Sequence, residues 1–115
     1  LQDGKPFVAL GSPGGSTIIT TVAQMLFNRI DRGMSIEESI AAPRAAQRNT
    51  ASVSAEQEFI DRYGTLLGAF GHEFANPAEI GAATAIEFGP DGLLTAVSEP
   101  TRRGGGSALV VEPAD

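Results

Sequence analysis

A glycine-rich segment near the start of the chain, Gly-Ser-Pro-Gly-Gly-Ser at residues 11–16, constrains the fold more than any other part of the sequence. Residues 6–10 before it are short, apolar and bounded by proline and glycine, which is typical of a β-strand. Residues 18–32 after it repeat apolar side chains at helical spacing, and Ser16 stands where a helix N-cap would. The segment therefore predicts a strand that turns directly into a helix.

The same turn predicts a binding site for negative charge. Free backbone N–H groups collect at a helix N-terminus, and the helix dipole adds partial positive charge there. Gly14 and Gly15 have no Cβ atom, so a ligand oxygen can approach their N–H groups closely. This favours an anion or oxyanion site, although glycines that only close a tight corner give the same pattern.

Three other motifs do not fit this segment. A P-loop requires lysine and then serine or threonine after its last glycine, whereas Ser16 and Thr17 follow Gly15. The dinucleotide fingerprint requires a glycine where Pro13 stands. A nucleophile elbow requires a glycine two residues after its serine, and Ile18 occupies that place.

The composition of the 115-residue chain excludes several classes of protein. Its 42% hydrophobic and 19% charged content is typical of one small folded domain. A net charge of −6, with only Arg102 and Arg103 adjacent among the basic residues, argues against a nucleic-acid partner. There is no cysteine, and no cluster of ligating side chains indicates a metal or another cofactor. No apolar run reaches membrane-spanning length.

Two shorter helices are predicted in the middle of the chain. Ser35 and Glu38 have the spacing of a capping box, which predicts a helix over residues 36–42 that ends before a proline. Apolar residues at helical spacing predict a third helix over residues 59–70, stopped by Gly71.

The strands predicted after the first helix complete the fold class. Residues 83–88 and 93–98 flank a Gly-Pro-Asp-Gly turn and form a strong hairpin signal. Residues 107–112 predict a last strand, and residues 52–55 predict an edge strand. We therefore expect an α/β (α+β) fold with a mainly antiparallel sheet covered by helices on one face. The Asp-Gly turn at residues 3–4 suggests that residues 6–10 are the second arm of a hairpin whose first arm is missing. The first strand would then have an unpaired edge.

Other polar candidates are interpreted as structural. Arg44 has the chemistry of a carboxylate anchor, but a surface or ion-pairing role is favoured. His72 is the only histidine, and it follows a helix stop without an acidic partner at motif spacing. Residues 102–106, Arg-Arg-Gly-Gly-Gly, resemble a phosphate grip, but a flexible loop between two strands is favoured. The sequence contains no complete constellation for nucleophilic or acid–base catalysis.

Several segments together resemble a known family. Residues 11–16, followed by Ile-Ile-Thr-Thr-Val at 18–22, closely resemble the gamma-glutamyltransferase (gamma-glutamyl transpeptidase) family. The resemblance continues in order through Ile-Ala-Ala-Pro-Arg at 40–44, Gly-His at 71–72 and Ser-Glu-Pro-Thr-Arg-Arg-Gly at 98–104. The last segment departs from the family, which usually has Asp-Pro-Arg there.

The resemblance implies both a fold and a function. Members are autoprocessed N-terminal-nucleophile hydrolases with an αββα sandwich, and they transfer or hydrolyse the γ-glutamyl group of glutathione and related amides. The two glycines after the proline supply N–H groups to the oxyanion hole, which by position implies Gly14 and Gly15. Residues 1–115 would be the C-terminal portion of the small subunit, as a single domain, with the threonine nucleophile and the glutamyl-binding residues upstream of Leu1.

The resemblance also implies partners and a location. The partners would be a γ-glutamyl substrate such as glutathione, an amino-acid or peptide acceptor, the rest of the small subunit, and the large subunit. The location would be periplasmic, secreted or at the cell surface. Leu1 cannot act as an N-terminal nucleophile, so the chain alone is predicted to be inactive. Apolar surface left uncovered would make it self-associate.

Two alternatives remain open at this point. The chain is also compatible with the C-terminal part of a related acylase, of the cephalosporin acylase or capsule transpeptidase type. A stand-alone anion-binding module that uses the Gly14–Gly15 turn is the third and least favoured interpretation.

Overall fold

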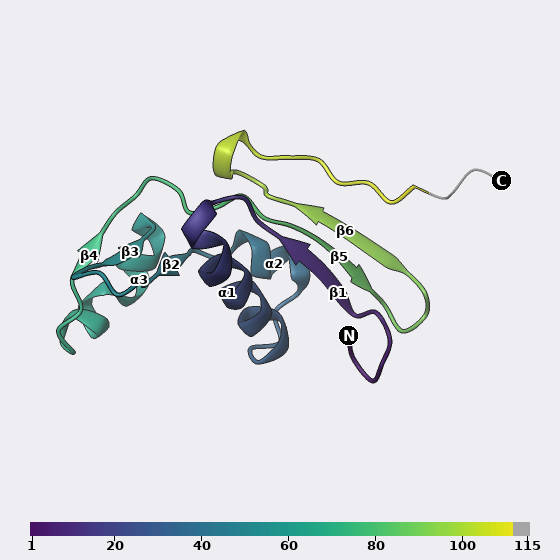
Figure 1. The fold of residues 1–115 in the computed structure, drawn as a ribbon, viewed down its shortest axis with the longest axis horizontal. Helices are drawn as coiled ribbons and strands as arrows, with labels where there is room; N and C mark the ends of the chain where they lie inside the picture. Colours follow the sequence, from purple (N-terminus) through teal and green to yellow (C-terminus); the bar gives the residue numbers. More distant parts are fainter. Residues whose placement is uncertain (112–115) are drawn as a thin grey trace.

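The computed structural model describes residues 1–111, and over that range two three-stranded sheets lie toward opposite ends of the molecule (Figure 1). The larger sheet has the order β1 (Val8–Gly11), β5 (Thr84–Phe88), β6 (Leu94–Ser98), and both of its strand pairs are antiparallel. The predicted hairpin is confirmed as β5 and β6, and the predicted first strand is confirmed as β1. β1 lies at one edge of this sheet, as expected.

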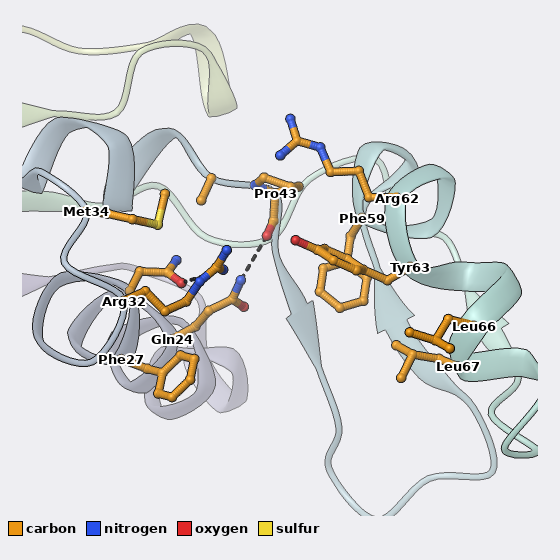
Figure 2. Close-up of a pocket in the computed structure, with 12 residues that line it drawn as sticks. Gln24, Phe27, Arg32, Met34, Pro43, Phe59, Arg62, Tyr63, Leu66 and Leu67 are labelled. Atoms are coloured by element: carbon orange, nitrogen blue, oxygen red, sulfur yellow. Dashed lines mark hydrogen bonds between the residues drawn. The ribbon is translucent and has the colours of Figure 1, made fainter.

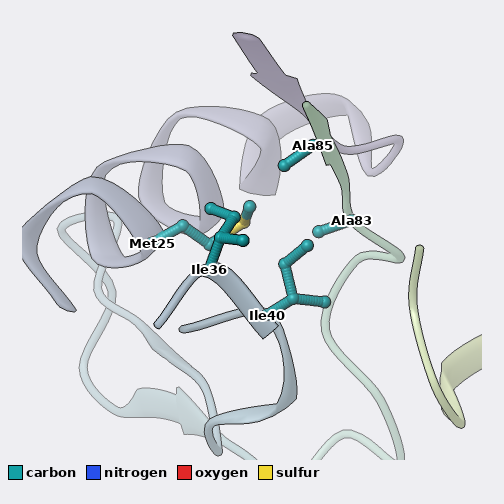
Figure 3. Packing of buried hydrophobic residues seen from close by; sticks show 5 residues of the cluster. All are labelled: Met25, Ile36, Ile40, Ala83 and Ala85. Carbon is teal, nitrogen blue, oxygen red and sulfur yellow. The ribbon is translucent and has the colours of Figure 1, made fainter. Parts of the chain in front are cut away.

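Two helices cover one face of the larger sheet, α1 (Ile18–Ile30) and α2 (Ile36–Ala41) (Figure 1). Their buried apolar side chains meet those of the sheet in a core made of Met25, Ile36, Ile40, Ala83 and Ala85 (Figure 3). Side chains alternate between the two faces of a strand. Ala85 therefore points into this core, whereas its neighbour Ile86 is 41% exposed on the opposite face. The predicted α+β architecture, with helices on one face of an antiparallel sheet, is confirmed.

The buried face of α1 is narrower than its apolar pattern predicts. Thr21, Met25 and Asn28 are buried at helical spacing, whereas Ile19 remains 78% exposed and Ile30 58% exposed. The polar side chain of Asn28 also lies on the buried side of the helix, and its Oδ1 accepts a hydrogen bond from Arg32.

The two ends of α1 also differ from the prediction. A short 3₁₀ turn, η1 (Gly15–Thr17), precedes the helix, and the N-cap is Thr17 rather than Ser16, without a side-chain capping bond. The helix ends at Ile30 instead of residue 32 because Gly33 takes a left-handed φ of 67° and turns the chain away.

The capping box of α2 is confirmed. Ser35 Oγ accepts from the Glu38 N–H at 3.1 Å, and the Glu38 carboxylate accepts from the Ser35 N–H at 2.8 Å. This satisfies two donors that the helix itself leaves free. The helix ends at Ala41, one residue earlier than predicted.

The second sheet has the order β2 (Ala45–Ala46), β3 (Val53–Ala55), β4 (Phe74–Ala75). The strand predicted over residues 52–55 is confirmed as β3, but its predicted place at an edge is wrong. β3 is central, because it pairs antiparallel with β2 and parallel with β4. The parallel pair is connected through α3 (Gln57–Gly68), which confirms the third predicted helix and begins two residues earlier.

The strand predicted over residues 107–112 is not formed over residues 107–111, and its last residue lies outside the described residues. Strand composition alone does not make a strand, because a strand also needs ladder hydrogen bonds to a neighbour. β6 pairs only with β5 among the described strands, so its outer edge stays unpaired and residues 107–111 do not occupy it. Figure 1 shows the segment running beyond η2 (Arg102–Gly104) without joining the sheet. No helix within residues 1–111 has the length and apolar character needed to cross a membrane.

Candidate functional site

The loop between β1 and α1 contains the two glycines that the sequence singled out. Gly14 has φ 146° and Gly15 has φ 55°, both in the region that favours glycine. The turn is closed by Thr17, whose N–H and Oγ1 both donate to the Gly14 carbonyl, at 3.1 and 3.0 Å. The predicted strand–turn–helix unit is therefore present. Gly15 opens only the 3₁₀ turn η1 and lies outside α1.

The two glycines are required for different reasons. A Cβ atom on Gly14 would lie 2.4 Å from Thr17 Oγ1, so this position is closed to every other residue unless the turn shifts. A Cβ atom on Gly15 would meet nothing within 4 Å. The space beside Gly15 is open, and only its left-handed φ restricts the residue type there.

The N–H groups of Gly14 and Gly15 form no hydrogen bond with any other group in residues 1–111. Gly15 is exposed and lies three residues before the start of α1. Unpaired N–H donors near a helix N-terminus favour a partial negative charge beside them.

Ser12 fixes the loop to the rest of the fold. Its Oγ accepts a hydrogen bond from the Ala82 N–H at 3.1 Å and donates to the Pro13 carbonyl at 2.8 Å. The approach is so close that a Cβ atom on Gly81 would lie 2.5 Å from Ser12 Oγ. The glycine turn is thus attached to the segment that leads into β5.

Ser16 has a neighbour that the sequence did not suggest. The guanidinium group of Arg48, from the loop between β2 and β3, donates a hydrogen bond to Ser16 Oγ. The Ser16 hydroxyl therefore points across to that loop instead of capping α1, which corrects the predicted role of this residue.

Arg44, Glu56, Glu99 and Arg102 form a buried ionic cluster. Its residues flank both sheets, because Arg44 precedes β2, Glu56 follows β3 and Glu99 follows β6. Arg102 binds the Glu56 carboxylate through two hydrogen bonds of 2.6 Å and Glu99 Oε1 through one of 2.9 Å. Arg44 Nη2 donates to Glu99 Oε2 at 2.8 Å. Two cations therefore neutralise two carboxylates inside the protein, as buried charges require.

This cluster corrects two predictions and confirms a third. Arg44 is only 2% exposed, so the surface role is wrong and the ion-pairing role is confirmed. Arg102 is only 7% exposed and bonded on several sides, so the expectation of a flexible loop is wrong at this residue.

Burial and ion pairing shift the pKa values in the cluster. Burial, together with the nearby Arg102 cation, lowers the pKa of Arg44. Burial alone would raise the pKa of Glu56, but hydrogen bonds from Arg102 and from two backbone N–H groups outweigh it, so the pKa is lowered. Burial would lower the pKa of Arg102, but Glu56 raises it. The shifts of Glu56 and Arg102 favour their charged forms, whereas that of Arg44 does not.

The cluster also supports the glycine turn. Glu56 Oε1 accepts from the Ile80 N–H at 2.9 Å, and Glu99 Oε2 accepts from the Ala83 N–H at 3.1 Å. Both carboxylates thus hold residues 80–83, the segment whose Ala82 N–H binds Ser12. A continuous set of hydrogen bonds connects the buried charges to the loop.

A second concave region is an apolar groove of about 580 Å³ between α1 and α3 (Figure 2). Phe27 and Met34 line one side, and Phe59, Tyr63 and Leu67 line the other. Its lining includes no carboxylate, histidine, serine or cysteine among the described residues. The groove has the shape of a site for an apolar group, without chemistry of its own.

The other polar candidates lie apart from the glycine turn or lack a catalytic partner within residues 1–111. His72 is exposed, and its backbone N–H donates to the Leu67 carbonyl at 3.2 Å near the end of α3, in keeping with a structural role. Within residues 1–111, no group of three or more ligating side chains comes together at one point. In the same range, neither Ser12 nor Ser16 is hydrogen-bonded to a histidine or carboxylate, so neither has the partner of an activated nucleophile.

The sequence did not indicate that Ser12 would bind the Ala82 N–H, or that Arg48 would bind Ser16. Arg44, Glu99 and Arg102 all lie inside the segments that carry the family resemblance, and this was the available signal for the ionic cluster. No comparable signal marked Arg48, because its contact joins two loops that are 32 residues apart.

Comparison with known proteins agrees with the geometry. The gamma-glutamyltranspeptidase family model matches residues 1–109. The chain is 41% identical over 101 residues to the glutathione hydrolase proenzyme of Escherichia coli (strain K12), covering 87% of this chain and 17% of that protein. It is 34% identical over 96 residues to the acylase ACY 1 proenzyme of Pseudomonas sp. (strain SE83), covering 83% of this chain and 17% of that protein.

Solved structures share the fold. The gamma-glutamyltranspeptidase of Pseudomonas nitroreducens, as its W525D mutant, superimposes with a TM-score of 0.85 at 28% identity, covering 98% of this chain and 59% of that chain. The fold is thus part of an N-terminal-nucleophile hydrolase. The chain belongs to the gamma-glutamyltranspeptidase family, and it spans less than a fifth of the length of the curated relatives described above.

Proposed function

We propose that this chain is the C-terminal portion of the small subunit of a γ-glutamyltransferase, where it contributes the backbone oxyanion hole. The observation that carries the proposal is the pair of unpaired N–H groups at Gly14 and Gly15, in a turn fixed by Ser12 and Thr17. Membership of the gamma-glutamyltranspeptidase family supports a reaction at an amide carbonyl, where such a pair would be useful.

In this proposal, the nucleophile comes from another part of the polypeptide. Its hydroxyl oxygen bonds to the γ-carbonyl carbon, and the carbonyl oxygen gains negative charge in front of Gly14 and Gly15. The amine then leaves with a proton, and water or an acceptor amine takes the γ-glutamyl group from the ester. Because the two N–H groups bind the oxyanion more strongly than the carbonyl, they lower the barrier; one such donor is typically worth about 10²–10³ in rate.

The substrates and partners belong to the same proposal. The relatives are named glutathione hydrolase proenzymes, which supports glutathione as the donor and a protein assembled from a cleaved precursor. We propose an amino acid or peptide as acceptor, the rest of the small subunit and the large subunit as partners, and a periplasmic, secreted or cell-surface location.

An acylase function is the second candidate. The 34% identity to an acylase proenzyme favours it, because the same loop would serve any amide whose carbonyl oxygen becomes negative. Parallel assays of the full-length protein with a γ-glutamyl anilide and with a cephalosporin side-chain amide distinguish the two functions.

The test replaces Gly15 with valine in the full-length, processed protein. A Cβ atom at residue 15 meets nothing within 4 Å, and the valine side chain should block approach to the N–H groups. We therefore expect single-turnover acylation by a γ-glutamyl anilide to fall about 100-fold. The matched control is Gly33→Val. Gly33 also has a left-handed φ, and a Cβ atom there would meet nothing within 4 Å, but it lies at the far end of α1.

Both variants carry the same kind of backbone strain, so equal melting temperatures with unequal acylation rates would support the oxyanion hole. A folded, processed Gly15→Val protein that acylates as fast as Gly33→Val would contradict it. The isolated 115-residue chain serves as a blank, and we expect no turnover from it because Leu1 cannot act as nucleophile.

A further inference from the structure

We propose that Arg48 binds a carboxylate of the substrate next to the oxyanion turn. This inference rests on the proposed function and adds a charged group from a different loop to the same site. It assigns to Arg48 a part in substrate binding that the glycine motif does not contain.

The position of Arg48 carries the proposal. Its guanidinium group donates to Ser16 Oγ, and Ser16 directly follows Gly15. The guanidinium is therefore hydrogen-bonded to the residue that directly follows the two N–H groups proposed to hold the carbonyl oxygen. A carboxylate a few bonds away from that carbonyl can reach both groups at once.

The loop that carries Arg48 is ordered by its own hydrogen bonds. The Gln47 side chain accepts from the Thr50 N–H at 3.0 Å, and Thr50 Oγ1 donates to the Ser52 carbonyl at 2.7 Å. Between them, Asn49 adopts a left-handed φ of 58°, which asparagine tolerates better than most residues. Arg48 is therefore presented from a turn with a defined shape.

The charge of Arg48 is available to a ligand. Ion pairs within residues 1–111 occupy Arg29, Arg44, Arg62 and Arg102. In the same range, Arg48 forms no ion pair, and its side chain donates a hydrogen bond to a neutral hydroxyl. It is an exposed cation in a chain of net charge −6. A guanidinium presents several N–H donors in a plane, so it can bind a carboxylate through two of them while it keeps the Ser16 contact.

A γ-glutamyl peptide offers two carboxylates of this chemistry. One is the α-carboxylate of the glutamyl group, and the other belongs to the amino acid or peptide on the amine side. Both lie a few bonds from the γ-carbonyl, and the experiment separates them.

The experiment compares Arg48→Gln, Arg48→Lys and the wild type in the full-length, processed protein. The first arm measures KM for a γ-glutamyl anilide, whose only carboxylate is on the glutamyl group. The second arm holds this donor constant and compares glycylglycine with glycylglycine amide as acceptors. The control is Arg62→Gln, which removes an exposed arginine from α3.

We expect Arg48→Gln to change one arm about tenfold, the scale of a hydrogen bond to a charged group. A raised anilide KM assigns the glutamyl carboxylate, and a lost preference for glycylglycine assigns the amine-side carboxylate. Arg48→Lys should recover part of the loss, and Arg62→Gln should change neither arm.

If the wild type turns over the anilide but Arg48→Gln changes both arms less than twofold, Arg48 does not bind a carboxylate. The oxyanion proposal then stands. If the folded, processed wild type fails to turn over the anilide, both proposals are wrong.

Discussion

At the scale of single residues, the loop depends on two serines that occupy opposite ends of one motif. Ser12 lies before the glycines and forms hydrogen bonds within the fold, to the Ala82 N–H and the Pro13 carbonyl. Ser16 lies after them, and its side chain contacts the exposed side chain of Arg48. Their contributions to stability should therefore differ, although both are serines next to a helix start.

Replacing each serine by alanine tests this difference. Ser12→Ala leaves the Ala82 N–H without its acceptor, so we expect a loss of about 1 kcal/mol in the free energy of unfolding. Ser16→Ala removes no helix cap and should stay within about 0.5 kcal/mol. Urea unfolding followed by circular dichroism measures both. A loss of about 1 kcal/mol for Ser16→Ala would restore the capping role that the sequence suggests.

The sequence predicts the glycines better than their neighbours. Gly14 and Gly15 are recognisable from the sequence because a positive φ strongly favours glycine over other residues. The cap at Ser16 is predicted wrongly because a 3₁₀ turn inserts before α1, which pattern reasoning does not resolve. Arg48 is missed because its contact depends on how two loops approach in three dimensions.

At the scale of elements, one ion pair connects a helix to the sheet. Arg29 of α1 donates to Glu87 of β5 through two hydrogen bonds of 2.5 and 2.9 Å, and its guanidinium lies 5.3 Å from the centre of the Phe7 ring. These hydrogen bonds lower the pKa of Glu87 and raise that of Arg29. The pair therefore makes the attachment of α1 dependent on pH.

The sign of this dependence follows from the lowered pKa of Glu87. The unfolded carboxyl titrates near 4.5, so the stabilisation is fully present above that pH and is lost as pH falls through the lower folded value. Between pH 7 and pH 3, the wild type should lose more unfolding free energy than Glu87→Gln. The comparison uses urea midpoints at both pH values, with Glu73→Gln, an exposed carboxylate, as control. Equal losses in the wild type and Glu87→Gln would contradict the prediction.

Helices and strands with a regular spacing of apolar residues can be predicted from the sequence. Short strands that form only because a distant strand pairs with them cannot. The three helices and the β5–β6 hairpin follow from apolar spacing and turn residues. The second sheet is missed because β2 and β4 are two residues long and β4 pairs in parallel through a crossover. Residues 107–111 have strand composition without a strand partner.

At the scale of the whole molecule, the described chain is elongated, with extents of 56 × 31 × 22 Å. Its radius of gyration is 15.7 Å, whereas a compact domain of this length has about 13 Å. The face of the sheet opposite the helices carries exposed Ile86 and Leu94, and β1 is an edge strand. In an αββα sandwich, this is the face that a second sheet covers.

We expect the isolated chain to self-associate through this surface. Sedimentation velocity should give a mass that rises with concentration. Ala9→Lys places a lysine on the exposed side of the edge strand. It should lower the association, because a charged side chain there disfavours pairing with a strand of another copy. Ala69→Lys, at the exposed end of α3, is the matched control. A monomer at every concentration would contradict the expectation.

The buried charges have a consequence for how the molecule opens. The two arginines of the ionic cluster donate to carbonyl groups at the end of α2, and its two carboxylates accept from N–H groups of residues 80–83. Arg102 also binds Glu56, which flanks the second sheet. Neither sheet can move away from the other without breaking these ion pairs. Guanidinium and carboxylate groups that are still buried would then lack partners, which is costly. The amide protons of both sheets should consequently exchange with deuterium in a single cooperative event, although the sheets share no strand.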